Sequence, residues 1–160
     1  MLHCSVTSVP FHPFPPFCMP PVPINYLAVV LAMVASMVIG FLWYGPLFGK
    51  TWIALMGFSQ AQMEKAKAAG MGKQLGLMAV GSLVMSFVLA HALVFASAYL
   101  NASGVSAGLM AGFWNWLGFI APVTLGSVLW EGKPWKLWLL NNGYHLVTLC
   151  VMGVILAEMP

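Results

Sequence analysis

The most regular feature of the chain is a series of long apolar runs separated by short polar segments. Four runs cover approximately residues 24–44, 75–99, 107–130 and 135–157. Each is close to the roughly 20 residues that a helix needs to cross the hydrocarbon core of a bilayer. Lipid offers no hydrogen-bond partner to backbone amides, so spanning segments of this length are helical. The pattern predicts an all-α, polytopic transmembrane bundle of four helices in residues 24–160.

Residues 1–23 interrupt this pattern before it begins. They contain seven Pro, and each Pro lacks an amide donor and clashes with the preceding helical turn. We therefore expect a disordered tail, and the sequence leaves open that translation begins at Met19. The tail includes side chains of the types that bind zinc, namely His3, Cys4, His12 and Cys18. Their spacing fits no paired zinc motif, so we expect no metal site there.

Composition agrees with a membrane protein. Hydrophobic residues make up 61% of the 160 positions and charged residues only 6%, whereas a soluble domain has about 25% charge. The formal net charge of +3 comes from scattered Lys rather than a basic groove, so no nucleic-acid partner is expected. The expected partners are the lipid bilayer and either further copies of the chain or another membrane protein.

The Lys residues predict the orientation. All six lie in two loops, residues 46–73 and 131–136, which four spans place on the same side of the membrane. They are Lys50, Lys65, Lys67, Lys73, Lys133 and Lys136. Because Lys-rich loops remain in the cytoplasm, we expect both loops to be cytoplasmic and both termini to lie outside the inner membrane.

Each cytoplasmic loop has one notable feature. In the longer loop, Ser59 and Gln62 form a capping-box pattern that predicts a short amphipathic helix over residues 60–69, which is either a solvated surface helix or a docking site. The shorter loop is a charged turn made of Trp130, Glu131, Gly132, Lys133, Pro134, Trp135 and Lys136. Glu131 either pairs with a neighbouring Lys to fix this turn or acts at a cytoplasmic mouth.

Small residues recur every four positions along the first span, at Ala28, Ala32, Ser36 and Gly40. This spacing places them on one helical face, where small side chains let a second helix approach closely. We expect that face to pack against another helix.

The segments 40–52 and 129–138 share a sequence pattern. Each contains Trp, Gly and Pro in this order, followed by a Lys-x-Trp tripeptide. Two repeated helical hairpins and convergence at a membrane interface both explain it.

Several motifs together resemble a known family. They are Ile24-Asn-Tyr-Leu-Ala28, Gly40-Phe-Leu-Trp-Tyr-Gly-Pro-Leu-Phe-Gly-Lys50, Leu129-Trp-Glu-Gly-Lys-Pro-Trp-Lys-Leu137 and Asn142-Gly-Tyr-His145. The chain resembles the small four-span bacterial proteins catalogued as domain of unknown function 1761, over about residues 24–157. The resemblance implies a bacterial inner membrane protein. It implies no activity, and it supplies no catalytic residue.

The candidate functional residues are therefore the polar groups inside the spans: His91, Asn115, Asn141, Asn142, Tyr144 and His145. Polar groups at membrane depth are costly and often mark a functional path. Counted from the 101–106 loop, His91 and Asn115 lie at the same depth, and His145 lies at a similar level. A polar layer of these three side chains is therefore compatible with the sequence.

Four interpretations compete for these groups. They are hydrogen-bonded contacts between helices, a proton or solute path, haem ligation by His91 and His145, and hydrolytic catalysis. No Asp occurs in the chain and no Glu falls within a span, so we expect no enzymatic activity, and we expect no cofactor. The function most compatible with the sequence is transport or permeation. The alternative is a structural or accessory subunit of another membrane protein.

Overall fold

The computed structural model describes residues 24–100 and 103–159. The Pro-rich segment 1–23 lies outside these described residues. Four helical segments are long and apolar enough to cross a membrane: Tyr26–Leu47, Gly72–Ser97, Gly104–Leu129 and Trp135–Glu158. They confirm the all-α bundle of four spans, and their ends lie within a few residues of the apolar runs.

The spans differ in regularity. The first consists of α1 (Tyr26–Leu42) and the π-helical η1 (Trp43–Leu47), and is followed by α2 (Gly49–Met56) and α3 (Gln60–Ala69). The second is the continuous helix α4 (Gly72–Leu100), and the fourth is α8 (Trp135–Glu158). The third is broken into α5 (Gly104–Asn115), the π-helical η2 (Trp116–Ile120), α6 (Ala121–Thr124) and α7 (Gly126–Leu129).

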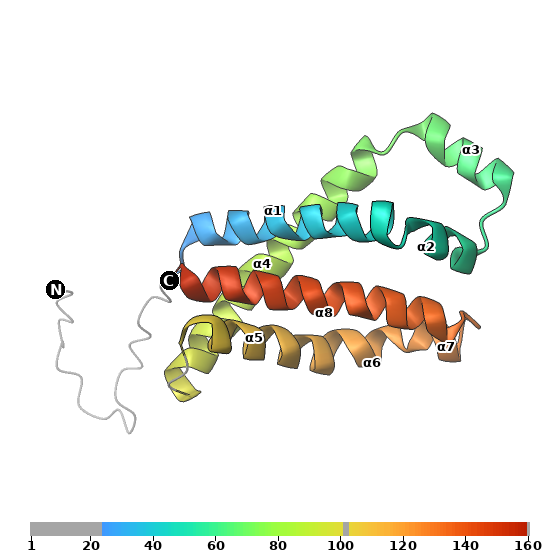
Figure 1. Cartoon of the computed structure of the whole chain (residues 1–160). Helices are drawn as coiled ribbons and strands as arrows, with labels where there is room; N and C mark the ends of the chain where they lie inside the picture. Colours follow the sequence, from blue (N-terminus) through green and yellow to red (C-terminus); the bar gives the residue numbers. More distant parts are fainter. Residues whose placement is uncertain (1–23, 101–102, 160) are drawn as a thin grey trace, which may run out of the picture.

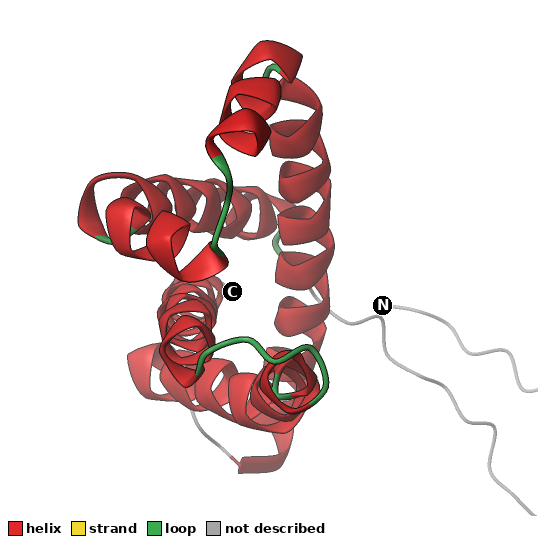
Figure 2. Cartoon of the chain, turned by 90° about the vertical axis from the view of Figure 1, so that its right-hand side faces the viewer, coloured by secondary structure: helices red, strands yellow, loops and turns green. Residues whose placement is uncertain are grey.

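Helix α8 is the centre of the bundle. It lies between α1 on one side and the α5–α7 run on the other, and packs against both (Figure 1). Helix α4 crosses behind these three and meets α1, α5 and α8. Its N-terminal half leans away from the bundle toward α3, which leaves it apart from α8 at that end (Figures 1 and 2).

Local sequence signals set the ends of several helices. The Asn25 side chain accepts hydrogen bonds from the amides of Leu27 and Ala28 at 3.0 and 3.2 Å, which caps α1. Before α3, the Ser59 amide donates to Gln62 Oε1 at 2.9 Å, and the Gln62 amide donates to Ser59 Oγ at 3.3 Å. The capping box predicted from the sequence is thus confirmed.

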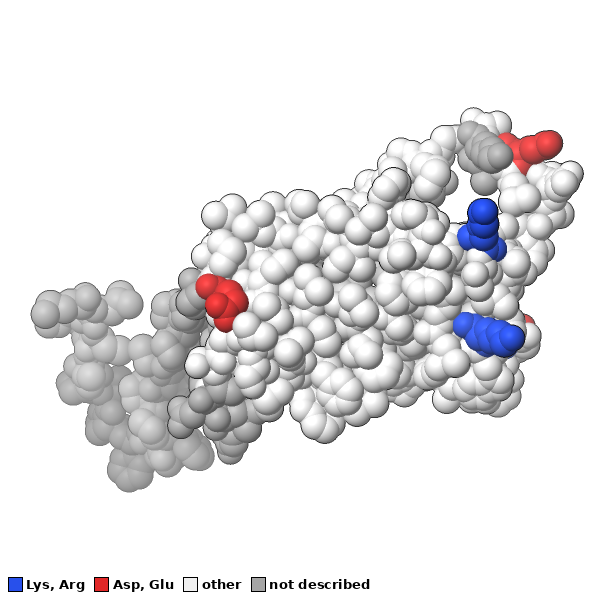
Figure 3. All heavy atoms as spheres, in the orientation of Figure 1, with Lys and Arg blue, Asp and Glu red and all other residues white. Residues whose placement is uncertain are grey.

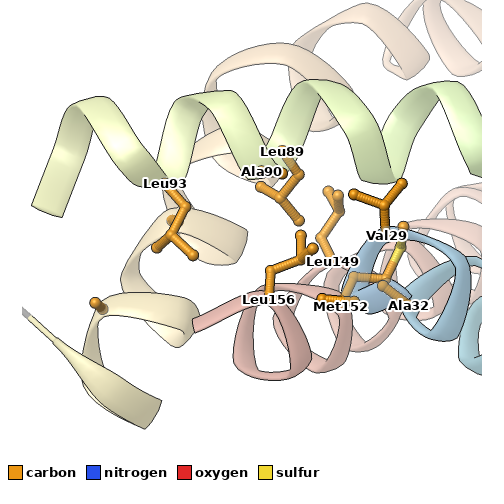
Figure 4. Close-up of a cluster of buried hydrophobic side chains, with 11 residues drawn as sticks. Val29, Ala32, Leu89, Ala90, Leu93, Leu149, Met152 and Leu156 are labelled. Carbon is orange, nitrogen blue, oxygen red and sulfur yellow. The ribbon is translucent and has the colours of Figure 1, made fainter. Parts of the chain in front are cut away.

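The small residues of α1 face inward. Ala28, Ala32 and Ser36 are 1%, 0% and 1% exposed, and a Cβ at Gly40 would lie 3.2 Å from the Tyr144 hydroxyl oxygen of α8. Next to this stripe lies the apolar core, to which α1, α4 and α8 contribute Val29, Leu89, Leu149, Met152 and Leu156 (Figure 4). One polar contact crosses this region, since Ser86 Oγ donates to the Val29 carbonyl at 2.9 Å.

The closest helix contact joins α5 to α8 through glycine. A Cβ at Gly108 would overlap the backbone of Gly153, and a Cβ at Gly112 would lie 2.6 Å from the Leu149 carbonyl oxygen. Glycines four positions apart form one flat helical face, so the two backbones can touch and gain dispersion contacts. This Gly-x-x-x-Gly face on α5 carries the tightest packing in the described bundle.

The two segments that look like a repeat have different conformations. Residues 43–47 are π-helical and lead almost directly into α2, whereas Trp130–Pro134 forms a turn with a φ of 68° at Gly132. The proposed duplication therefore has no shared local structure at these positions and stays a hypothesis about the sequence.

Replacing Gly112 with Ala should destabilise the bundle by about 1–3 kcal/mol, because the new methyl group overlaps the α8 backbone. The matched control is Gly81→Ala on α4, where a Cβ meets no atom within 4 Å; this change should be neutral or stabilising by up to about 1 kcal/mol. Denaturation of both variants in mixed micelles, followed by circular dichroism, measures the difference. Equal stability of the two variants would contradict the α5–α8 contact.

Candidate functional site

A cavity of about 760 Å³ opens where α4 leans away from α8. Five of its lining residues come from the first turns of α8: Trp138, Asn141, Asn142, Tyr144 and His145. The remaining wall is formed by η1, α2, the first turns of α4, and the end of the third span with Glu131. Four of the six candidate polar residues therefore line one cavity, at the end of the bundle that carries α2, α3 and α7.

Asn142 is a structural member of this wall. It is 2% exposed, and its amide nitrogen donates to Thr124 Oγ1 at 3.0 Å and to the Trp138 carbonyl at 3.1 Å. The Thr124 hydroxyl in turn donates to the Ile120 carbonyl at 2.7 Å. Asn142 thus ties α8 to α6 close to the irregular segment η2.

A second set of contacts ties η1 to α8. The Tyr44 hydroxyl donates to Asn141 Oδ1 at 3.1 Å, and Trp43 Nε1 donates to the Leu140 carbonyl at 3.2 Å. Gly143 leaves room for Trp43, since a Cβ there would lie 3.3 Å from the indole ring. Two of the motifs on which the family resemblance rests, in 40–50 and 142–145, therefore meet in space.

His145 is a polar group of the cavity wall that is held by packing rather than by hydrogen bonds. Its half-buried ring lies against Tyr144, with the ring centroids 5.0 Å apart. Among the described residues, no hydrogen bond involves its nitrogens, and the buried Trp138 Nε1 likewise has no partner. The Asn141 Oδ1 is occupied by Tyr44, which leaves the Asn141 amide nitrogen available. The His145 ring and the Asn141 amide nitrogen are therefore the lining groups of α8 that remain open to a hydrogen-bonding ligand, whereas Trp138 Nε1 is enclosed.

His91 and Asn115 are not part of this cavity. His91 Nδ1 lies 2.8 Å from the Phe87 carbonyl of its own helix, and its ring packs edge-on against Phe87 at 4.4 Å. Asn115 donates to the Ala111 carbonyl, also on its own helix, at 2.8 Å and lines a separate cavity of about 110 Å³. Among the described residues, no hydrogen bond joins any two of His91, Asn115 and His145, and only His145 lines the large cavity.

The charged turn is held by its backbone. The Lys133 amide donates to the Ser127 carbonyl at 3.0 Å, and Gly132 adopts a positive φ. In the described part of the chain Glu131 forms no ion pair, and its exposed side chain borders the cavity. Trp130 and Trp135 are 87% and 56% exposed, and both lie at the same end as the Lys side chains drawn in Figure 3.

A smaller cavity of about 340 Å³ lies at the opposite end of the bundle, where Asn25, Leu93, Ser97 and Leu156 are among its lining residues. Helices α4 and α8 contribute to both cavities. The layer between the cavities is closed by buried side chains of the same two helices: Ser86, Leu89, Thr148, Leu149 and Met152, each no more than 4% exposed.

The fold and cavities define a multi-pass membrane protein made of four apolar helices around a closed centre. The chain belongs to the family described as Protein of unknown function (DUF1761), whose model matches residues 27–157. This match confirms the resemblance drawn from the loop motifs. Neither a curated protein nor a solved structure matches the chain.

Replacing Asn142 with Ala should lower the stability of the folded protein by about 1–2 kcal/mol, because it removes the hydrogen bonds that this buried side chain makes with the Thr124 hydroxyl of α6 and with the Trp138 carbonyl of α8. Asn141→Ala is the matched control. This half-buried neighbour makes one hydrogen bond among the described residues, to Tyr44, so its loss should cost less. Denaturation of the two variants in the same detergent compares them, and a smaller loss for Asn142 than for Asn141 would contradict its structural role.

Proposed function

We propose that this protein mediates transport or permeation of a small solute across a bacterial inner membrane. The observation that carries the proposal is the pair of cavities at opposite ends of the bundle, both lined by α4 and α8 and separated by one packed layer. A path that is open at both ends and closed at its centre requires only a local rearrangement of that layer.

In the proposed orientation, the larger cavity opens toward the cytoplasm. The Lys side chains drawn in Figure 3 lie at the end with α2, α3 and α7, away from the C-terminus. Lys-rich loops remain on the cytoplasmic side during insertion. Both termini of the bundle then lie outside, where the smaller cavity opens.

Met152 is the residue most suited to control the closed layer. Its side chain is 0% exposed and lies among Ala32, Leu89 and Leu149 (Figure 4). Methionine has three rotatable side-chain bonds and fills irregular space with little conformational preference. A change of its rotamer therefore alters the closure at low cost without moving a helix.

Met152→Ala should raise the permeability of proteoliposomes to small neutral solutes by at least several-fold, because it removes most of the side chain from the closed layer. Stopped-flow light scattering with water, urea and glycerol gradients provides the measurement. Met110→Ala is the control, since Met110 is 39% exposed on α5. Unchanged permeability of a folded Met152→Ala protein would contradict this path.

The two histidines provide a second comparison. His145 lines the large cavity, whereas His91 bonds within its own helix. His145→Ala should therefore change the solute flux of the Met152→Ala protein at least two-fold, and His91→Ala should leave it unaltered. The reverse result would place the path elsewhere in the bundle.

The alternative function, an accessory subunit, is favoured by a single observation. Helix α3 lies away from the bundle and most of its described side chains are exposed (Figure 1). A membrane protein partner would contact this helix rather than the cavity. Under this alternative, reversing the charges of Glu64 and Lys65 releases a co-purifying partner, while the variants of Met152 and His145 have no effect on flux.

A further inference from the structure

The large cavity has an unequal distribution of charge. Glu131 is the only Asp, Glu or Lys side chain among its described lining residues, and it forms no ion pair there. The other polar groups on the wall are amides, hydroxyls, two indoles and an imidazole. The one formally charged group among the described lining residues is therefore a carboxylate, which attracts positive charge.

Aromatic rings add to the same preference. Tyr44 lies between Trp52 and Tyr144, with ring centroids 5.5 and 5.1 Å apart and interplanar angles of 69° and 61°. Tyr44 and Trp52 are half-buried and line the cavity, whereas Tyr144 is only 6% exposed. The face of an aromatic ring attracts a cation by about 0.5–2 kcal/mol, depending on how far the contact is removed from water.

The rest of the wall suits a large apolar body. Met56 of α2, Met71 just before α4 and Met78 of α4 line the cavity, and methionine side chains adapt to ligands of different shape. The volume of about 760 Å³ lies within the range of roughly 300–1,000 Å³ that is typical of sites for small organic molecules.

We propose that the large cavity binds a lipophilic organic cation, with its positive centre near Glu131 and the rings, and its apolar body against the methionines. This proposal rests on the cavity assigned to the permeation path and names its class of ligand. An anion would meet no fixed positive charge on the wall, and a neutral ligand would leave Glu131 unpaired.

The Lys side chains at this end of the bundle do not oppose the proposal. Lys50, Lys73, Lys133 and Lys136 are all absent from the lining; Lys133 is half-buried and the other three are exposed. Exposed charges are screened beyond about 8 Å at physiological ionic strength, whereas the rings and Glu131 border the cavity itself. The local groups therefore decide which charge is bound.

The experiment uses two probes of nearly equal size and opposite charge, tetraphenylphosphonium and tetraphenylborate. Equilibrium dialysis of the full chain in detergent, corrected with empty micelles, measures their binding. We expect saturable binding of tetraphenylphosphonium, at least ten-fold tighter than that of tetraphenylborate. Equal affinities, or tighter binding of the borate, would overturn the proposal.

Variants locate the binding site. Glu131→Gln should weaken tetraphenylphosphonium binding about three- to five-fold. Trp52→Leu is an independent second variant that should also weaken the binding, and it tests the site if the Glu131→Gln protein does not fold. Glu64→Gln is the matched control, because it removes the same charge from an exposed position on α3 outside the lining. Equal effects of the two Glu variants would show that the net charge of this end, rather than the cavity, attracts the probe.

The binding experiment and the flux experiment test the cation site and the permeation path independently. Binding that depends on Glu131, combined with an unchanged solute flux in Met152→Ala, supports the cation site and contradicts the path. A flux that responds to Met152→Ala, combined with equal binding of both ions, supports the path and contradicts the ligand class.

Discussion

Contact between the backbones of α5 and α8 is the constraint on which the other features of the bundle depend. Within lipid, apolar side chains gain little by leaving the solvent, so helices associate through close packing and hydrogen bonds. Gly108 and Gly112 allow α8 to approach α5 until their backbones meet. On its other side, α8 meets the small residues of α1. Two faces of α8 are therefore covered, one by α5 and one by α1. Helix α4 packs against the bundle mainly through the half that carries Ser86, Leu89 and Leu93.

This division of contacts explains why the cavities lie at the ends. A long, straight helix such as α4 that crosses the bundle at an angle is close to its neighbours only near the crossing. Gly76 and Gly81 in its N-terminal half have no neighbouring atom within 4 Å of a Cβ position. His145 of α8, for which no hydrogen bond is found among the described residues, thus borders the large cavity on this side. The packing that closes the centre and the opening that exposes this group have the same geometric cause.

The sequence predicted the features that depend on local pattern. Hydropathy gave the four spans, because their length is fixed by the bilayer, and a period of four residues identified the buried stripe at Ala28, Ala32 and Ser36. The same spacing at Gly108 and Gly112 is the sequence signal that corresponds to the α5 face in contact with α8. The expectation of one polar layer assumed that side chains at equal depth face each other. Depth follows from counting residues, but the rotation of a helix about its axis does not, and His91 and Asn115 bond within their own helices.

In the charged turn at Glu131, the backbone has a structural role and the carboxylate is available for a functional one. From the sequence, the mixture of Glu131 with two neighbouring Lys residues favoured an ion pair that fixes the turn. In the structure, Gly132 and the Lys133 amide form the turn through the backbone, which leaves the carboxylate without a structural task among the described residues. An exposed ion pair would have contributed only about 0–1 kcal/mol, so little stability is lost by leaving it unformed. A carboxylate beside an aromatic cavity is then available for an external cation, and this availability links the shape of the turn to the chemistry of the site.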